Sequence, residues 1–219
     1  MKTFIIIPCY NESAHLAEVI NNVKEYGEVI VVDDGSTDNS RQLAQNLGVT
    51  VLEHLINRGQ GAALETGDSY ALNKGADIVV HFDADGQHQA GEIPKLIKPI
   101  TEGRADIVMG SRFLNQTGQT PFFKKWLILK PAALFQNLMY GAKLTDAHNG
   151  FRALSHKALE KIRITQDRMA HPSEIIEQIV NNELRYLEVP VTIRYYEFGQ
   201  GLTGGFKILR DIIFGKINK

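Results

Sequence analysis

Short apolar runs alternate with amphipathic stretches through the first half of the chain. The runs rich in Val and Ile predict strands over Phe4–Ile7, Glu28–Val32, Val49–Leu52, Asp77–Phe82 and Asp106–Met109. The stretches between them predict helices over Asn11–Tyr26, Asp38–Leu47, Gly59–Lys74 and Gly91–Thr101. Single helices between successive strands indicate right-handed crossover units and a mostly parallel sheet that is covered on both faces.

The pattern becomes less regular after Ser111. The segments predicted there are a helix over Phe122–Tyr140, a β segment over Asn149–Leu154, a helix over Pro172–Asn181 and a strand or hairpin over Arg185–Tyr196. The tail, Gly205–Lys219, has the pattern of a basic amphipathic helix, which could pack on the domain or lie on a membrane surface. Without a linker or repeat, residues 1–204 are predicted to form one domain, followed by this helix.

Composition restricts the class of protein. With 219 residues, 43% of them hydrophobic, the chain can bury a full core, and a net charge of −1 gives no reason to expect nucleic acid as a partner. The single cysteine, Cys9, excludes an intrachain disulfide and fits a reducing compartment. No apolar run reaches the roughly 18–20 residues of a membrane span. We expect a cytoplasmic protein, attached at most to the surface of the cytoplasmic membrane.

Asp83, Asp85 and Gln87 follow the predicted strand that ends at Phe82. In an extended backbone alternate side chains project to one side, so the three can converge. Two adjacent carboxylates repel each other unless a cation lies between them, and Mg²⁺ or Mn²⁺ prefers oxygen ligands and leaves positions for phosphates. Because Asp-x-Asp-Gly is also an ordinary turn sequence, the metal interpretation depends on the neighbouring motifs.

Polar clusters also follow the first two predicted strands, at Pro8–Glu12 and Asp33–Asp38. Ligands of open parallel sheets bind at the carboxyl ends of the strands. Asp34 could accept hydrogen bonds from a base or ribose, and Tyr10 could stack on a base. For Ser36, Thr37 and Asp38 we favour capping of the next helix. Further on, the glycines of Asn57–Gly61 could let backbone amides at a helix start approach an anion.

Six motifs occur in a fixed order: Ile7–Glu12, Val32–Asp38, Asn57–Gly61, Asp83–His88, Gly110–Phe113 and Gly150–Arg152. Together they resemble family 2 glycosyltransferases, and especially the branch with dolichyl-phosphate mannose synthase and bacterial polyprenyl-phosphate glycosyltransferases. The resemblance covers roughly residues 3–200. It implies a hexosyltransferase with a single α/β domain of the GT-A type, in which a Rossmann-like, mostly parallel central sheet is flanked by helices.

The resemblance also implies roles by position. Residues that match donor-nucleotide positions are Pro8, Tyr10, Glu12, Val32, Asp34 and Ala84. Asp83, Asp85 and Gln87 match the metal-binding set, with Asp85 and Arg112 expected to be catalytic. Arg112 and Arg194 match arginines that contact phosphates, and Asp146 and Arg152 match a polar pair near the acceptor. The chain departs from the family pattern at Gln200, where a Lys is usual, and at Asn149, where a small residue is usual. These departures weaken the assignment of the acceptor more than that of the fold.

The implied reaction is an inverting transfer of a sugar from a UDP- or GDP-sugar to a polyprenyl phosphate, with Mg²⁺ or Mn²⁺. Lys124, Lys125 and Trp126 would suit an acceptor embedded in a membrane, and equally ordinary packing. An alternative acceptor is a sugar hydroxyl of a lipid-linked glycan or polysaccharide. It would need a general base, for which Glu174 is the candidate, although an acid there also suits a first helical turn.

The same motifs disfavour other classes of protein. His88 and His171 are expected to be polar rim residues rather than ligands. A nucleotidyltransferase would need a Gly-rich basic loop after the first strand, and Pro8–Glu12 is not such a loop. A hydrolase that used Asp83 and Asp85 would leave the polar clusters after the first two strands without a role. A catalytically weak, nucleotide-binding scaffold is the non-enzymatic alternative, and the intact Asp83–Gln87 motif argues against it.

Overall fold

The computed structural model describes residues 1–114 and 144–194 of the chain. Several predictions lie outside these ranges: the helices over Phe122–Tyr140 and Gly205–Lys219, and the positions of Lys124, Lys125, Trp126 and Gln200. Within the two described ranges, no helix is both long enough and apolar enough to cross a bilayer.

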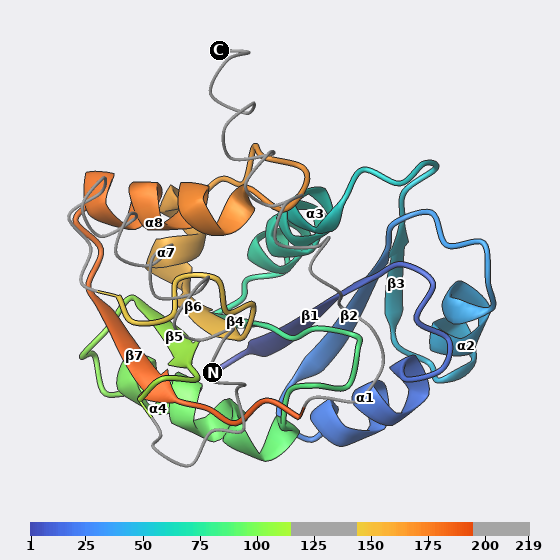
Figure 1. The fold of residues 1–219 in the computed structure, drawn as a ribbon, viewed down its shortest axis with the longest axis horizontal. Coiled ribbons are helices and arrows are strands. Elements are labelled where there is room, and N and C mark those ends of the chain that lie inside the picture. The colour runs from blue at the N-terminus through green and yellow to red at the C-terminus, as the bar shows by residue number, and fades with distance from the viewer. Residues whose placement is uncertain (115–143, 195–219) are drawn as a thin grey trace.

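The described strands form one sheet in the order β3-β2-β1-β4-β6-β5-β7 (Figure 1). Their bounds are β1 Thr3–Cys9, β2 Glu28–Asp33, β3 Thr50–Glu53, β4 Ile78–His81, β5 Ile107–Ser111, β6 Arg152–Ser155 and β7 Tyr186–Pro190. β1 to β4 pair in parallel, as do β5 and β7, whereas β6 runs antiparallel to both β4 and β5. The mostly parallel sheet is thus confirmed, but the place of β6 between β4 and β5 was not predicted.

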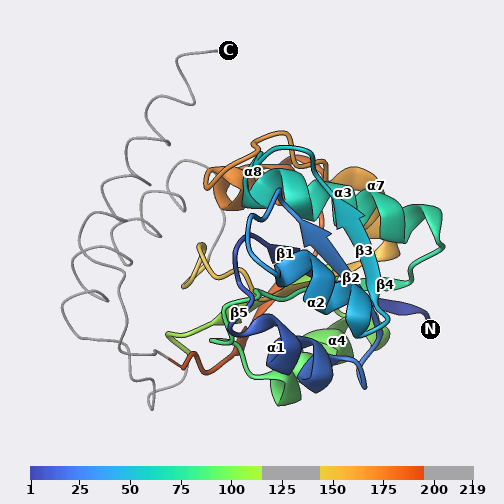
Figure 2. The same cartoon turned by 90° about the vertical axis from the view of Figure 1, so that its right-hand side faces the viewer.

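Helices cover both faces of the sheet, as Figures 1 and 2 show. Their bounds are α1 Leu16–Val23, α2 Ser40–Asn46, α3 Gln60–Asn73, α4 Ile93–Thr101, α7 His156–Lys161 and α8 His171–Asn181, with a 3-10 turn η1 at Ala90–Glu92. α3, α7 and α8 lie on one face, and α1, α2 and α4 lie on the other. The short helix α7 was not predicted from the sequence.

Alternation along β1 divides the core between the two faces. Phe4 and Ile6 pack on the α3 side, and Ile5 and Ile7 pack on the α1 side, all fully buried. α3 approaches β1 so closely that a Cβ added at Gly67 would overlap the Ile6 side chain. This close contact fixes the position of α3, whose first turn lies at the carboxyl ends of the parallel strands.

The loops after β1 and β2 are tied to each other by hydrogen bonds. Asn11 has a positive φ of 56°, and its Oδ1 accepts the backbone N–H of Thr37 at 2.8 Å. α1 therefore begins at Leu16, not at Asn11. Ser36 Oγ accepts the Asn11 N–H at 3.0 Å, so Ser36 does not cap α2, whereas Asp38 accepts the N–H of Ser40 at 2.9 Å. The N-cap residue of α2 is Asn39, which makes no side-chain capping bond, so the capping prediction is met only in that Asp38 accepts the first N–H of the helix.

Candidate functional site

A cleft of about 480 Å³ opens at the carboxyl ends of β1, β2 and β4. The predicted site residues that line it are Pro8, Tyr10, Glu12, Asp34, Asp83, Ala84, Asp85, Arg112 and Arg152. Tyr10 is 46% exposed, which leaves its ring open to a ligand. Most of the residues selected from separate motifs are therefore brought together at one edge of the sheet.

Asp83 is held on three sides. Gln60 Nε2, at the start of α3, donates to Asp83 Oδ1 at 2.8 Å, and His88 Nε2 donates to Oδ2 at 2.9 Å. A Cβ added at Gly150 would lie 2.7 Å from Oδ2, so only glycine leaves room for the carboxylate there. Burial alone would raise the Asp83 pKa, but the His88 hydrogen bond and the positive charge of Arg152 lower it. Asp83 is accordingly ionised.

Asp85 and Glu12 lie on the same side of the cleft, where few positive charges offset their negative charges. Asp85 Oδ1 accepts the Gln87 N–H at 2.9 Å. Burial and the charge of Asp83 raise the Asp85 pKa, and burial and the charge of Asp85 raise the Glu12 pKa. These shifts indicate an excess of negative charge, with hard oxygen donors, in the cleft.

That excess of charge fits a divalent cation such as Mg²⁺ or Mn²⁺. Within residues 1–114 and 144–194, no set of three His, Cys, Asp or Glu side chains is arranged around a common metal position. Gln87, the third predicted ligand, does not line the cleft, and its backbone carbonyl accepts the Arg194 N–H at 2.9 Å. Asp83 and Asp85 remain the residues that fit a metal, while the geometry gives no support to Gln87.

Asp34 is engaged by the chain itself. Its Oδ1 accepts the N–H of Arg58 at 2.9 Å and lies 2.7 Å from His54 Nδ1, and its Oδ2 accepts the N–H of Gly59 at 2.6 Å. The amides before α3 therefore hold an internal carboxylate. The amides of Arg58 and Gly59 are therefore not available to an external anion, and the approach of an anion to the other amides of this segment stays a prediction. Asp34 still borders the cleft, where its contact with a nucleoside stays a prediction.

The glycine at the start of α3 serves packing. The Ala62 N–H donates to the Asp167 carbonyl at 3.0 Å, and a Cβ added at Gly61 would overlap the Gln166 carbonyl oxygen. The 166–167 loop thus satisfies and covers the first turn of this helix. Val32 does not line the cleft either, because its side chain is fully buried in the core on the α3 side, which contradicts a side-chain contact with the nucleoside.

Arg112 makes a two-point ion pair with Asp146. Arg112 Nε and Nη2 donate to the two Asp146 oxygens, each at 2.6 Å, and Asp146 is buried. Glu188 in turn accepts the backbone N–H of Asp146 at 2.9 Å. Asp146 therefore orients Arg112 and does not itself line the cleft, whereas Arg152, the other residue predicted near the acceptor, does line it.

Arg152 is a buried cation in the cleft wall. Its guanidinium donates to the carbonyls of Asn149 at 3.1 Å and Gly150 at 3.3 Å. Burial lowers its pKa to about 10, and the charges of Asp83 and Asp68 oppose that shift, so Arg152 is charged at neutral pH. The cleft hence combines an acidic side with two arginines, Arg112 and Arg152.

The two histidines expected at the rim lie inside the protein. His171 is 1% exposed and donates from Nδ1 to the Arg168 carbonyl at 2.7 Å. Burial and the nearby charge of Arg152 lower its pKa to about 3, so His171 is neutral. The side chain of His88 is 5% exposed. Sequence analysis missed their buried contacts because no local pattern distinguishes a buried histidine from an exposed one.

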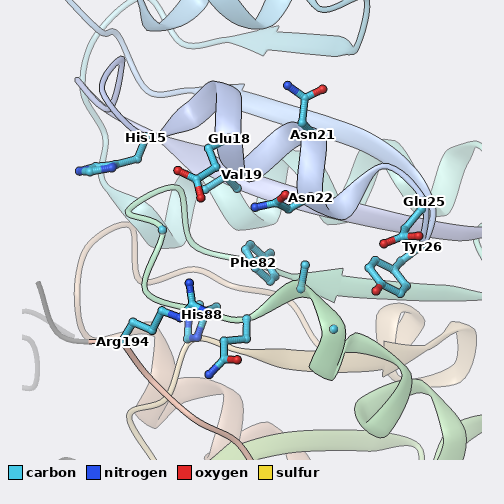
Figure 3. Close-up of a pocket in the computed structure, with 14 residues that line it drawn as sticks. His15, Glu18, Val19, Asn21, Asn22, Glu25, Tyr26, Phe82, His88 and Arg194 are labelled. Carbon is cyan, nitrogen blue, oxygen red and sulfur yellow. The ribbon is translucent and has the colours of Figure 1, made fainter.

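Glu174 and Arg194 lie outside the cleft. Glu174 is in the first turn of α8, and its carboxylate accepts the N–H groups of Thr165 at 3.0 Å and Gln166 at 2.9 Å. That engagement contradicts a role as general base. Arg194 lines a second, smaller pocket of about 330 Å³ beside α1, in which it lies near His88 (Figure 3). Its predicted contact with a phosphate stays a prediction.

Comparison with known proteins agrees with this geometry. The family model for glycosyl transferase family 2 matches residues 4–163. The UDP-N-acetylglucosamine–dolichyl-phosphate N-acetylglucosaminyltransferase of Methanococcus voltae is 33% identical, over 99% of this chain and 96% of that protein. The polyprenol monophosphomannose synthase of Mycolicibacterium smegmatis is 29% identical, over 97% of this chain and 84% of that protein.

The fold is also found among solved structures. Glucosyl-3-phosphoglycerate synthase of Mycobacterium tuberculosis, crystallised with Mn²⁺, UDP and glucosyl-3-phosphoglycerate, matches with a TM-score of 0.77 and 19% identity, over 97% of this chain and 77% of that chain. The family predicted from the ordered motifs is therefore confirmed, and so is the GT-A fold. This chain belongs to glycosyl transferase family 2 and is a glycosyltransferase.

Proposed function

We propose that this glycosyltransferase transfers a sugar from a UDP- or GDP-sugar to a polyprenyl phosphate, with inversion at the anomeric carbon and with Mg²⁺ or Mn²⁺. The observation that carries the proposal is the cleft in which Asp83 and Asp85 lie with Arg112 and Arg152. Such a site suits a reaction between two phosphate-bearing substrates. The names of two relatives, which specify dolichyl phosphate and polyprenol as acceptors, support the same acceptor class here.

The donor would occupy the side of the cleft near β1 and β2. Tyr10 can stack on the base, and the loop held by Asp34 bounds this side. Asp83 and Asp85 would hold the metal ion, which neutralises charge on the departing diphosphate. Arg112 adds hydrogen bonds to the same phosphates, and its two bonds to Asp146 fix the guanidinium plane.

The acceptor side favours an anion over a sugar hydroxyl. A phosphate is already ionised at neutral pH, so its oxygen can attack the anomeric carbon without a base, while the bond to the diphosphate breaks. A hydroxyl would need a base at hydrogen-bond distance, and Glu174 is engaged elsewhere by Thr165 and Gln166. Arg152 offers a buried positive charge to a second anion.

A polyprenyl phosphate acceptor would also determine where the reaction takes place. A polyprenyl chain stays in the bilayer, so the phosphate must be met at the membrane surface. We therefore place the reaction at the cytoplasmic face of a membrane, where the protein attaches peripherally. Sedimentation with vesicles that contain polyprenyl phosphate, compared with vesicles that lack it, would measure this attachment. If the protein stays in the supernatant with both kinds of vesicle, the proposed attachment is contradicted.

A donor screen tests the reaction. UDP- and GDP-sugars are incubated with polyprenyl phosphate or with a lipid-linked sugar, with Mn²⁺ or with a chelator, and products are identified by mass and anomeric configuration. We expect a polyprenyl-phosphate sugar of inverted configuration, formed only with the metal. Transfer to the lipid-linked sugar alone would establish the hydroxyl acceptor instead. Calorimetric titrations that detect no nucleotide binding would favour the scaffold alternative.

A further inference from the structure

We infer that His88 is a positioning residue that fixes the Asp83 carboxylate for metal binding, an inference that rests on the proposed function. Nε2 of His88 lies 2.9 Å from Asp83 Oδ2. A carboxylate only accepts hydrogen bonds, so the hydrogen of the ring must be on Nε2. Gln60 takes the other oxygen at 2.8 Å, and together the two donors fix the plane of the carboxylate.

The protein holds the His88 ring in place. Its ring centroid lies 4.9 Å from that of Phe151 and 5.6 Å from that of Phe82, the latter in an edge-on arrangement. The backbone of His88 forms an antiparallel bridge with Ile193. The two phenylalanine rings pack against it and the β-bridge holds its backbone, so these contacts restrain the ring on the sides that do not border the pocket lined by Arg194.

The second ring nitrogen supplies no competing reason for this orientation. Nδ1 of His88 is buried, and no residue of the two described ranges hydrogen-bonds to it. A buried polar atom without a partner is unfavourable, so the ring is oriented at the expense of Nδ1. Residues that hold a metal ligand in this way typically change metal affinity or activity by about tenfold to a hundredfold when they are removed.

Two substitutions separate the hydrogen bond from the packing. In His88→Gln the amide nitrogen can reach the place of Nε2, whereas in His88→Asn it reaches only the place of Nδ1. Both remove the aromatic ring, so they are matched for lost packing. We expect His88→Asn to weaken Mn²⁺ binding and lower kcat about tenfold to a hundredfold, and His88→Gln to recover most of this loss.

Mn²⁺ binding is measured by electron paramagnetic resonance with UDP and, separately, with GDP, and thermal unfolding is measured without metal. Equal behaviour of the two variants, or wild-type Mn²⁺ affinity in His88→Asn, overturns the inference. Nitrogen NMR of the metal-free protein gives an independent readout, since the ring hydrogen should be on Nε2. A hydrogen on Nδ1 also overturns the inference. Failure of the unaltered protein to bind Mn²⁺, with the Nε2 signal present, overturns the metal proposal and leaves the His88–Asp83 bond established.

Discussion

Gly150→Ala is the most specific test of the site, because the three atoms nearest to the new methyl group all belong to the Asp83 carboxylate. A Cβ at Gly150 would lie 2.7 Å from Asp83 Oδ2 and 3.1 Å from Oδ1, whereas ordinary contact begins at 3.4 Å. The carboxylate would have to move by roughly 0.7 Å in a closely packed site. That movement breaks or lengthens the hydrogen bonds from Gln60 and His88, which are 2.8 Å and 2.9 Å long.

The size of the effect follows from those two bonds. A hydrogen bond to a charged group contributes about 1.5–3 kcal/mol, so the loss of one should weaken Mn²⁺ binding about tenfold to a hundredfold. The free energy of unfolding should change by no more than about 2 kcal/mol, because rotation of one side chain relieves the overlap. Mn²⁺ titration in the presence of UDP or GDP, together with urea unfolding, measures both quantities.

Gly91→Ala is the matched control, since a Cβ there meets nothing within 4 Å. It should leave Mn²⁺ binding and stability unchanged. The reasoning is refuted if Gly150→Ala binds Mn²⁺ as tightly as the unaltered protein. It is also refuted if the Gly150 variant unfolds globally, because the overlap would then not be confined to one carboxylate.

Four further outcomes are expected. Asp85→Ala should abolish transfer and metal-dependent nucleotide binding, and turnover at the wild-type rate would contradict this. Without metal, the variant should be at least as stable in urea as the unaltered protein, because burial and the charge of Asp83 already disfavour the ionised carboxylate of Asp85. Arg112→Ala should raise the KM for the donor at least about tenfold with Mn²⁺ binding retained, as calorimetry would show. His171 is protonated in the unfolded chain below about pH 6.5 but has a folded pKa of about 3. The free energy of unfolding should therefore fall as pH drops between these values, by up to about 1.4 kcal/mol per pH unit. His171→Gln should flatten this dependence, as measured by urea unfolding at pH 7, 6 and 5. Asp106→Ala should cost about 2–3 kcal/mol in urea unfolding, because the buried carboxylate accepts the backbone N–H of Arg185 at 2.9 Å and its guanidinium at 2.8 Å; an unchanged midpoint would contradict this role.

Residue periodicity and chain order were enough to predict the layered sheet and the edge at which the site lies. Alternation along β1 assigns Phe4 and Ile6 to one face and Ile5 and Ile7 to the other, as the structure shows. Polar motifs that follow parallel strands must meet at the same edge, because the carboxyl ends of those strands point the same way. The location of the acidic motif at Asp83 and Asp85 therefore followed from periodicity and chain order alone.

Which side chains pair with one another depends on the packing of segments that are distant along the chain. Antiparallel β6 lies beside β4 and brings Gly150 and Arg152 to Asp83, although 67 residues separate Gly150 from Asp83 along the chain. The same packing pairs Arg112 with Asp146 and engages the carboxylate of Glu174. Several donors in the sequence could satisfy each carboxylate, and the one that does so is the one that packing brings within about 3 Å. Local periodicity fixes the face and the edge on which a residue lies, but it carries no information about that final distance.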